Sequence, residues 1–187
     1  MGEYLLKELD FRGSAFEERS FNEFYDEYYK KIYNFVYFKT GDAFLAEDLA
    51  SVVVEKALNN LKKFDEAKSS LNSWIFTIAR NSIIDYYRLK SSNESHFEEG
   101  EEISIPDKVT PGTEEALIET EQQEIIAELL QNIPEQDREI LILKFWGGLK
   151  NIEIADQMGI KAGNVNVIVF RALKKLKSMI DENNILL

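Results

Sequence analysis

Apolar side chains recur every three or four positions along most of this chain, the spacing that places them on one face of an α-helix. Such stripes run through residues 21–35, 45–61 and 71–82, and again through 117–130 and 162–176. No stretch alternates between apolar and polar residues as a half-buried strand does, and the three prolines lie outside the predicted helix interiors. The pattern therefore predicts an all-α fold.

Turn and capping residues predict where these helices begin and end. Thr40-Gly41-Asp42 and the polar stretch 65–70 separate the first three helices, the third of which is expected from about 71 to 88. A later helix is predicted to start near Thr113, a good N-cap, and to end near Asn132.

Two more breaks shape the end of the chain. Pro134 suits the first turn of a helix, where its missing N–H costs nothing, and Gly147-Gly148 would end that helix. Helices are then expected at about 150–158 and 162–177, separated by a tight turn that begins with Gly159. A short helix, a tight turn and a longer basic helix are typical of a helix-turn-helix, here at about 151–170.

The charge of the chain is concentrated in one segment. Its 34 acidic and 22 basic residues give a net charge of -12, which speaks against a nucleic-acid binder. Residues 91–128, however, hold twelve acidic residues and a single basic one, and the segment opens with a Ser-, Glu- and Pro-rich composition. We therefore expect two small helical domains, 16–90 and 113–180, joined by a flexible acidic linker over 91–112.

Each predicted domain ends in a basic stretch. Residues 62–90 carry six basic and three acidic side chains, and residues 161–177 carry five basic side chains and no acidic one. Both stretches could face the phosphates of a nucleic acid. The net charge of the whole chain therefore does not exclude DNA binding.

The last predicted helix carries a candidate DNA-reading face. Its apolar stripe, expected to pack on the preceding helix, is Val165, Val169, Ala172 and Leu176. The side chains left to point outward are Asn164, Asn166, Val167, Arg171 and Lys174. Asparagine can pair with adenine and valine can touch a thymine methyl group, whereas arginine and lysine suit phosphates. The alternative interpretation is a helical hairpin with a solvated lysine face.

Aromatic and basic residues are interleaved at the end of the first domain. The aromatic residues are Phe64, Trp74, Phe76, Tyr86 and Tyr87, and the cations among them are Lys62, Lys63, Arg80 and Arg88. Such a mixture suits single-stranded DNA, because unstacked bases stack on aromatic rings while cations hold the backbone. The alternative is that most of these rings belong to the core, above all Trp74 and Phe76.

Several classes of protein are excluded or disfavoured. The chain has no cysteine, so it has no disulfide, thiolate metal site or cysteine nucleophile, and its only histidine is His96. The paired glutamates at 98–99 and 101–102 lie in the predicted linker without a rigid scaffold, and no glycine-rich phosphate loop is present. We therefore expect no enzyme activity, cofactor or metal. The chain also lacks a membrane-length apolar run and a signal-peptide core, which predicts a cytoplasmic protein without membrane insertion.

Two sets of motifs resemble a known family. The first set is Ala46-Glu47-Asp48-Leu49, Lys63-Phe64-Asp65, Ser73-Trp74-Ile75 and the run from Ile78 to Arg88, and it resembles region 2 of the sigma-70 transcription initiation factors. The second set is Ile133-Pro134-Glu135, Arg138-Glu139-Ile140-Leu141, Glu153-Ile154-Ala155, Met158-Gly159-Ile160 and 171–176, and it resembles their region 4. Two short domains with only a linker between them are similar to the extracytoplasmic-function (ECF) subgroup.

The resemblance implies a bacterial alternative sigma factor that directs core RNA polymerase to promoters. By resemblance, Glu47, Asp48, Leu49 and Val52 would meet the clamp coiled coil of the polymerase. Region 2 would melt the −10 element and hold a flipped base with Lys63, Phe64, Ser69, Ser70, Asn72, Trp74, Arg80, Asn81, Tyr86 and Arg88. Region 4 would grip the polymerase flap and read the −35 element with Lys161, Asn164, Asn166, Val167, Arg171, Lys174 and Lys175. Anti-sigma factors are common partners in this subgroup.

The sequence departs from the family pattern at a few positions. Ser51-Val52 stands where a Gln-Glu pair is usual, and 164–168 lacks two of the usual recognition-helix cations. Lys150 and Lys161 stand where Ser or Thr caps are usual. These departures leave two alternatives open: a sigma-like module that binds without productive initiation, and a polymerase-independent helix-turn-helix regulator. The acidic linker could imitate RNA in the polymerase channel or simply keep the two domains apart.

Overall fold

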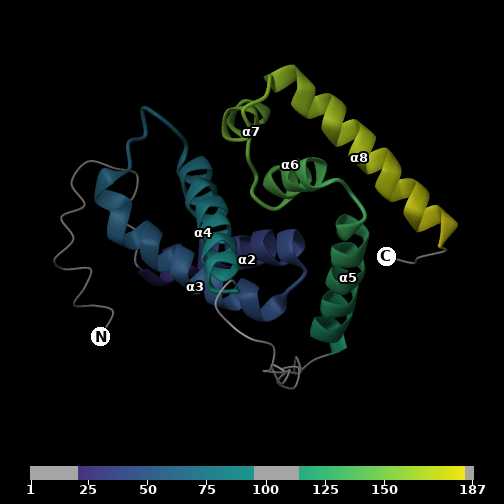
Figure 1. The fold of residues 1–187 in the computed structure, drawn as a ribbon, viewed down its shortest axis with the longest axis horizontal. Coiled ribbons are helices and arrows are strands. Elements are labelled where there is room, and N and C mark those ends of the chain that lie inside the picture. Colours follow the sequence, from purple (N-terminus) through teal and green to yellow (C-terminus); the bar gives the residue numbers. More distant parts are fainter. Residues whose placement is uncertain (1–20, 95–113, 184–187) are drawn as a thin grey trace.

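The computed structural model describes residues 21–94 and 114–183, and its regular structure there is entirely helical (Figure 1). In chain order the helices are α2 (Phe21–Thr40), α3 (Ala43–Asn60), the 3-10 turn η1 (Leu61–Lys63), α4 (Leu71–Glu94), α5 (Glu114–Gln131), α6 (Glu135–Phe145), α7 (Asn151–Met158) and α8 (Ala162–Glu182). No strand occurs within these two ranges, which confirms the all-α prediction. None of the helices described is both long enough and apolar enough to cross a bilayer.

Helices α2, α3 and α4 form a first lobe, and its first turn follows the capping signals in the sequence. Gly41 has a φ of +76°, a left-handed conformation that glycine adopts without strain. The carboxylate of Asp42 then accepts a hydrogen bond from the N–H of Leu45 at 3.0 Å and caps α3. The predicted break at 40–42 is therefore a tight corner between two antiparallel helices.

The core of the first lobe joins large side chains on α2 to small ones on α3. Ile32 and Phe35 are fully buried, and the facing Ala46 and Ala50 are small enough for the two helix backbones to approach closely. The ring of Phe35 meets that of Phe76 on α4 edge to face, with centroids 5.3 Å apart. This packing fixes the position of α4, which carries most of the predicted −10 residues.

Helices α5 to α8 form a second lobe, where proline and glycine mark the helix ends. Pro134 immediately precedes α6, as predicted. Gly147 follows α6 at a close approach, because a Cβ there would lie 2.7 Å from the carbonyl oxygen of Leu143. Gly159 ends α7 with a φ of +65°, and the N–H of Ile160 donates to the carbonyl of Ala155 at 2.9 Å.

The pair α7 and α8 has the packing expected of a helix-turn-helix. Val165 and Ala172 on α8 are buried, as are Ile154 and Ala155 on α7. The remaining stripe residues Val169 and Leu176 are half-buried against the same core. The predicted apolar stripe of α8 therefore faces the second lobe, and the opposite face of α8 is exposed.

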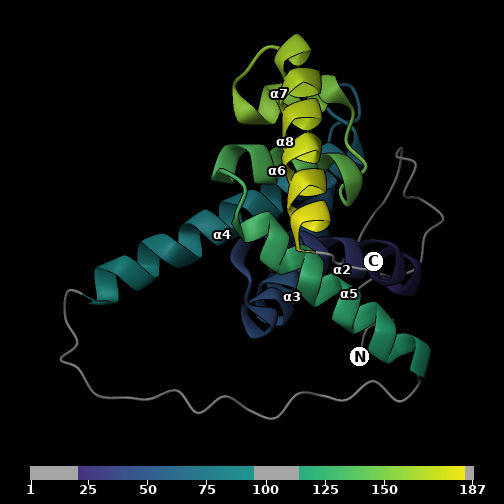
Figure 2. The ribbon, with the colours of Figure 1, turned by 90° about the vertical axis from the view of Figure 1, so that its right-hand side faces the viewer.

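Two helices are longer than the sequence patterns indicate. Helix α4 continues to Glu94 rather than ending near residue 88, so residues 91–94 of the predicted linker are helical. Helix α8 continues to Glu182 rather than ending near residue 177. Neither extension contains glycine or proline, so nothing forces the helices to stop where their apolar stripes end. Figure 2 shows the extended end of α4 projecting away from the rest of the molecule.

The two lobes share one continuous core. The buried hydrophobic cluster includes side chains of α2, α3 and α4 together with side chains of α5 to α8. Phe38 of α2 packs on Trp146, which follows α6, with ring centroids 4.5 Å apart. Helix α6 thus lies between α8 on one side and the first lobe on the other (Figure 1). The sequence predicts two domains but contains no signal for this contact.

Candidate nucleic-acid interface

The loop between η1 and α4 is shaped by a short acidic turn. The Asp65 carboxylate accepts a hydrogen bond from the N–H of Ala67 at 3.0 Å and pairs with Lys68 at 3.2 Å. These contacts, the backbone hydrogen bond first, hold the pKa of Asp65 below its ordinary value. The ring of Phe64, at the start of the loop, packs on Trp74 with centroids 5.3 Å apart. The loop is therefore tied back to α4 at its aromatic base.

A pocket of about 410 Å³ opens beside this loop. Its lining residues come from α3, η1 and α4, and they are Lys56, Asn60, Lys63, Trp74, Ile78, Asn81 and Ser82. The pocket combines an indole face, two lysines and two side-chain amides, which are groups that stack on bases, hold phosphates and pair with base edges. It brings together three of the predicted −10 residues, Lys63, Trp74 and Asn81. Sequence reasoning did not predict Lys56 or Asn60 here, although α3 places both one or two turns before Lys63.

Four other predicted −10 residues contact the second lobe. Ser70 donates from its hydroxyl to the carboxylate of Glu153. The Asn72 side chain donates to the carbonyl of Gly147 at 3.3 Å and accepts from the hydroxyl of Tyr28 at 3.0 Å.

Arg80 donates from Nε to Glu139 at 2.9 Å. Half-buried Trp74 lies in the pocket wall rather than in the centre of the core. It is Phe76, 0% exposed, that takes the core position between them.

The remaining predicted −10 residues lie apart from the pocket. Ser69 is half-buried in the loop, and Tyr86 is half-buried on α4. Arg88 is exposed and forms an ion pair with Asp85 at 3.1 Å, one turn earlier on α4. These positions extend the candidate surface along α4 toward its projecting end.

The predicted −35 residues divide into exposed side chains and anchors. Arg171 makes a two-pronged contact with the buried carboxylate of Asp137, with distances of 2.6 and 2.9 Å from Nη2 to the two oxygens. Lys175 donates to the carbonyl of Asn132 at 2.7 Å, and Asn166 accepts from the side chain of Asn151 at 2.5 Å. The exposed members of the predicted set without such an anchor contact are Lys161, Asn164, Val167 and Lys174.

One exposed residue of α8 was not predicted as part of this face. Phe170 is 73% exposed and Val167, three residues earlier, is 64% exposed. Residues three apart lie on the same side of a helix, so the two side chains form an apolar ridge between Asn164 and Lys174. The helical spacing from Val167 could have identified Phe170, which a large aromatic side chain disguises as a core residue.

The starts of α7 and α8 lack the usual hydroxyl caps. At α7, Glu153 partly compensates, because its carboxylate accepts from the N–H of Lys150 at 2.7 Å. At α8, Lys161 contributes no side-chain cap. The lysine at the first of these positions therefore costs the helix less than its residue type alone would indicate.

The predicted polymerase-binding residues lie in the first half of α3. Glu47 and Asp48 are exposed and Val52 is 39% exposed, whereas Leu49 is 7% exposed and packs in the core. Burial first, and then the charge of Glu47, raises the pKa of Tyr33 on the neighbouring α2. The exposed surface here is thus an acidic edge backed by tyrosine.

The second lobe also contains an apolar groove that sequence reasoning did not predict. It has a volume of about 300 Å³ and lies between α5, α6 and α8. Its lining residues are Ile126, Leu129, Leu130, Leu141, Phe145, Trp146, Leu173, Leu176, Lys177 and Ile180. The groove lies beside the helices around 134–158 that the resemblance assigns to the flap. Among the described residues no group of acidic and histidine side chains is placed to hold a metal ion.

Known proteins match the chain over both lobes. Residues 24–92 match sigma-70 region 2, and residues 123–176 match sigma-70 region 4. The chain is 32% identical over 162 residues to the RNA polymerase sigma factor YlaC of Bacillus subtilis, with 84% of this chain and 90% of YlaC covered. It is 26% identical over 178 residues to the ECF RNA polymerase sigma factor BldN of Streptomyces coelicolor, with 95% of this chain and 67% of BldN covered.

A solved structure has the same fold. The sigma factor RpoE of Bartonella quintana, in complex with the anti-sigma factor NepR, superposes with a TM-score of 0.62 at 21% identity, covering 86% of this chain and 96% of RpoE. The two region matches fall on the lobe with the base-sized pocket and on the lobe with the helix-turn-helix. The chain therefore belongs to the sigma-70 family as an ECF sigma factor, a non-catalytic subunit that directs promoter recognition by RNA polymerase.

Proposed function

We propose that the first lobe opens the −10 element and the second lobe reads the −35 element of a bacterial promoter in the cytoplasm. The proposed division is region 2 over 16–90, the acidic linker over 91–112 and region 4 over 113–180. The observation that carries the proposal is the pocket beside Trp74, which offers a ring, cations and amides to one unstacked base.

The pocket has the chemistry that strand opening requires. Extruding a base costs a few kcal/mol of lost stacking, about what one base stacked on an aromatic side chain returns. Trp74 supplies the face, Asn60 and Asn81 supply donors and acceptors for a base edge, and Lys63 holds the adjacent phosphate. Tyr86 and Arg88 would then follow the strand along α4.

For the second lobe we propose that α8 enters the major groove with its exposed face. Asn164 would pair with a base edge, and Val167 would contact a thymine methyl group. Lys161 and Lys174 would hold phosphates on either side. Arg171, Lys175 and Asn166, predicted as DNA contacts from the sequence, are proposed instead to hold α8 in place or to contact DNA only after releasing their present partners.

We propose two contacts with core polymerase. Glu47, Asp48 and Val52 would bind the clamp coiled coil, with Leu49 supporting them from the core. The apolar groove between α5, α6 and α8 would receive the flap. Solved relatives are complexes with anti-sigma factors, NepR for RpoE and CnrY for CnrH, and we propose that a protein of this class also regulates this chain.

The direct test is transcription with purified core polymerase. Promoters are first mapped after overexpression, and a mapped promoter is then transcribed with core polymerase and either the wild-type chain or Trp74→Ala. The wild type is expected to co-purify with core polymerase and initiate, and Trp74→Ala is expected to co-purify but initiate poorly. Failure of the wild type to bind core polymerase would overturn the proposal.

A second candidate function is a sigma-like module that binds polymerase without productive initiation. The observation that favours it is at the departure from the family pattern, where the Ser51 hydroxyl bonds its own helix at the carbonyl of Glu47, 3.1 Å away. It is thus less available to a partner than a Gln-Glu pair would be. Binding to core polymerase without a rise in fluorescence from a base analogue in the −10 element would favour this function.

A further inference from the structure

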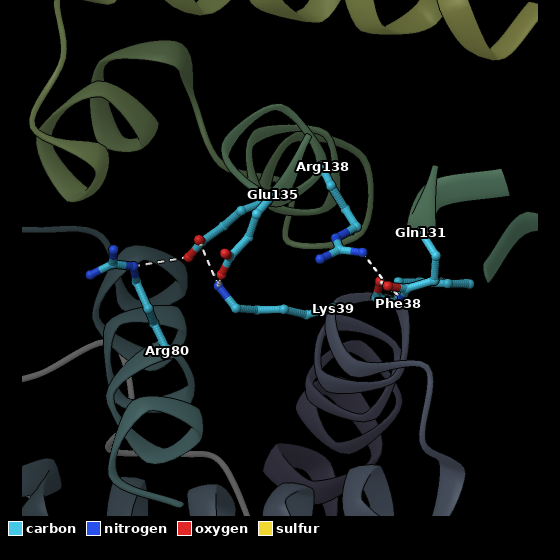
Figure 3. A network of polar contacts seen from close by, with 7 residues as sticks. Phe38, Lys39, Arg80, Gln131, Glu135 and Arg138 are labelled. Carbon is cyan, nitrogen blue, oxygen red and sulfur yellow. Dashed lines mark hydrogen bonds and ion pairs between the residues drawn. The ribbon is translucent and has the colours of Figure 1, made fainter. Parts of the chain in front are cut away.

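A buried carboxylate ties the two lobes together. Glu139 of α6 is 4% exposed, and it accepts from Lys39 of α2 at 2.6 Å and from Arg80 of α4 at 2.9 Å (Figure 3). On the same face of α6, Arg138 donates to Gln131, whose amide also reaches the carbonyl of Phe38 at 3.4 Å. One side chain of the second lobe thus neutralises two cations of the first.

The same interface covers the beginning of α4. Gln157 of α7 donates to the backbone carbonyl of Ser73 at 2.7 Å and to its hydroxyl at 3.1 Å. The contacts of Ser70 with Glu153 and of Asn72 with Gly147 lie on the same stretch. The residues that the proposed function assigns to the −10 strand are therefore in contact with α7 and the end of α6.

The compact arrangement is also too short for a promoter. Elements named −35 and −10 lie about 25 base pairs apart, which is about 85 Å of duplex at 3.4 Å per base pair. A compact chain of 187 residues has a radius of gyration of about 16 Å. The two lobes must separate before each can lie on its own element.

From these contacts we infer that the free chain inhibits itself. The second lobe occupies the promoter-facing side of the first, and Glu139 is the latch that holds Arg80 away from DNA. This inference rests on the proposed function for the meaning of the covered surface, but the latch itself is a property of the free chain. Core polymerase would bind the open form and so shift the population toward it.

The chemistry of the latch makes opening sensitive to one carboxylate. Lys39 has a side chain 9% exposed and that of Glu139 is 5% exposed, so separating the lobes returns both charges to water. In the open form Arg80 is released for phosphate. A DNA strand would offer Arg80 the same kind of partner, an oxygen anion, which is why Glu139 can compete with it.

The test measures lobe separation in the full chain. Because the protein has no native cysteine, Asn59→Cys on α3 and Asp156→Cys on α7 can carry a donor and an acceptor dye. We expect high energy transfer in the free chain, lower transfer in Glu139→Gln, and low transfer in both when core polymerase is added. Glu135→Gln is the matched control, since Glu135 is exposed and reaches Lys39 only at 3.9 Å.

DNA binding by the free chain provides the second readout. The probe is a fluorescein-labelled pool of random 12-nucleotide single strands, which needs no known promoter. Glu139→Gln is expected to bind the pool about tenfold more tightly than the wild type or Glu135→Gln, the ratio that corresponds to loss of one charged hydrogen bond. Equal transfer and equal affinity in Glu139→Gln and the wild type would overturn the inference.

A reversible lock covers the case in which Glu139→Gln does not fold. Cysteines at Lys39 and Glu135 are joined by a short bis-maleimide that contains a disulfide. The locked chain is expected to bind the pool poorly and to recover binding when the linker is reduced. Unchanged binding by the locked chain would overturn the inference. Failure of the proposed function would instead appear as no initiation with core polymerase, whatever the lock does.

Discussion

Arg171 and Lys174 are both cations of α8, yet their surroundings assign them different work. Arg171 pairs with Asp137, which is 5% exposed, whereas Lys174 is exposed without a printed anchor of this kind. Arg171→Ala would leave a buried carboxylate without its partner. We expect it to lower the free energy of unfolding by about 1–3 kcal/mol, because the arginine end of the pair is itself exposed to solvent. Urea unfolding measures this, and an unchanged midpoint would contradict it.

Lys174→Ala is the matched change on the same helix. We expect it to leave the urea midpoint within about 0.5 kcal/mol of the wild type. It should instead reduce the salt dependence of binding to a random-sequence duplex, lowering the slope of log K against log salt by about 1. Fluorescence anisotropy at several salt concentrations measures the slope. A slope equal to that of the wild type would show that Lys174 makes no phosphate contact.

Trp74 tests the proposed base pocket at the level of one ring. Trp74→Ala should weaken binding of single-stranded DNA by the core polymerase complex by about 1–3 kcal/mol, the contribution of one stacked base. Trp74→Phe keeps an aromatic face and should recover most of the loss. Circular dichroism of each variant separates this effect from unfolding. Equal weakening by alanine and phenylalanine would indicate a packing role for Trp74 instead.

Among whole helices, the turn between α7 and α8 offers a pair of glycines with opposite demands. Gly159 has a φ of +65°, so Gly159→Ala should destabilise the second lobe by about 1–2 kcal/mol. Gly163 lies in the first turn of α8 with open space around it, so Gly163→Ala should stabilise by about 0.4–1 kcal/mol. Thermal unfolding compares the two. Shifts of the same sign would contradict the assigned conformations.

The helices show how far local signals reach. Asp42, Pro134 and Gly159 mark helix ends because capping and backbone conformation act within a few residues, and each is where the sequence places it. The last turns of α4 and α8 could not be predicted, since an apolar stripe ends where packing ends and not where the helix ends. The anchoring of Arg171 was missed for a related reason: its partner Asp137 lies on another helix, 34 residues away.

For the molecule as a whole, what could not be predicted is the contact between the lobes. Its members are far apart in the chain and ordinary in kind, such as Lys39 with Glu139 and Phe38 with Trp146. Nothing in a helical stripe distinguishes a side chain that packs within its own lobe from one that packs on the other. The base pocket was predicted in part, because Lys63 and Trp74 lie close in sequence, while Lys56 and Asn60 come from the preceding helix.

The shared core has a consequence for unfolding that separates it from the ion-pair latch. Phe38 is 1% exposed and packs on Trp146, so the lobes are coupled by apolar contact as well as by charge. We expect the wild type to unfold in urea as one transition, and Trp146→Ala to split it into two as the coupling is lost. Phe35→Ala is the control, because Phe35 is buried against Phe76 within the first lobe.

Phe35→Ala should lower the midpoint of a single transition, by about 3–5 kcal/mol of unfolding free energy, without splitting it. Tryptophan fluorescence reports mainly the local surroundings of Trp74 and Trp146, whereas circular dichroism at 222 nm follows helices of both lobes. Coincident curves from the two probes in the wild type, and separated curves from circular dichroism in Trp146→Ala, are the expected pair. Two transitions in the wild type would mean that the lobes fold independently, so that the charged latch alone would have to hold the closed form.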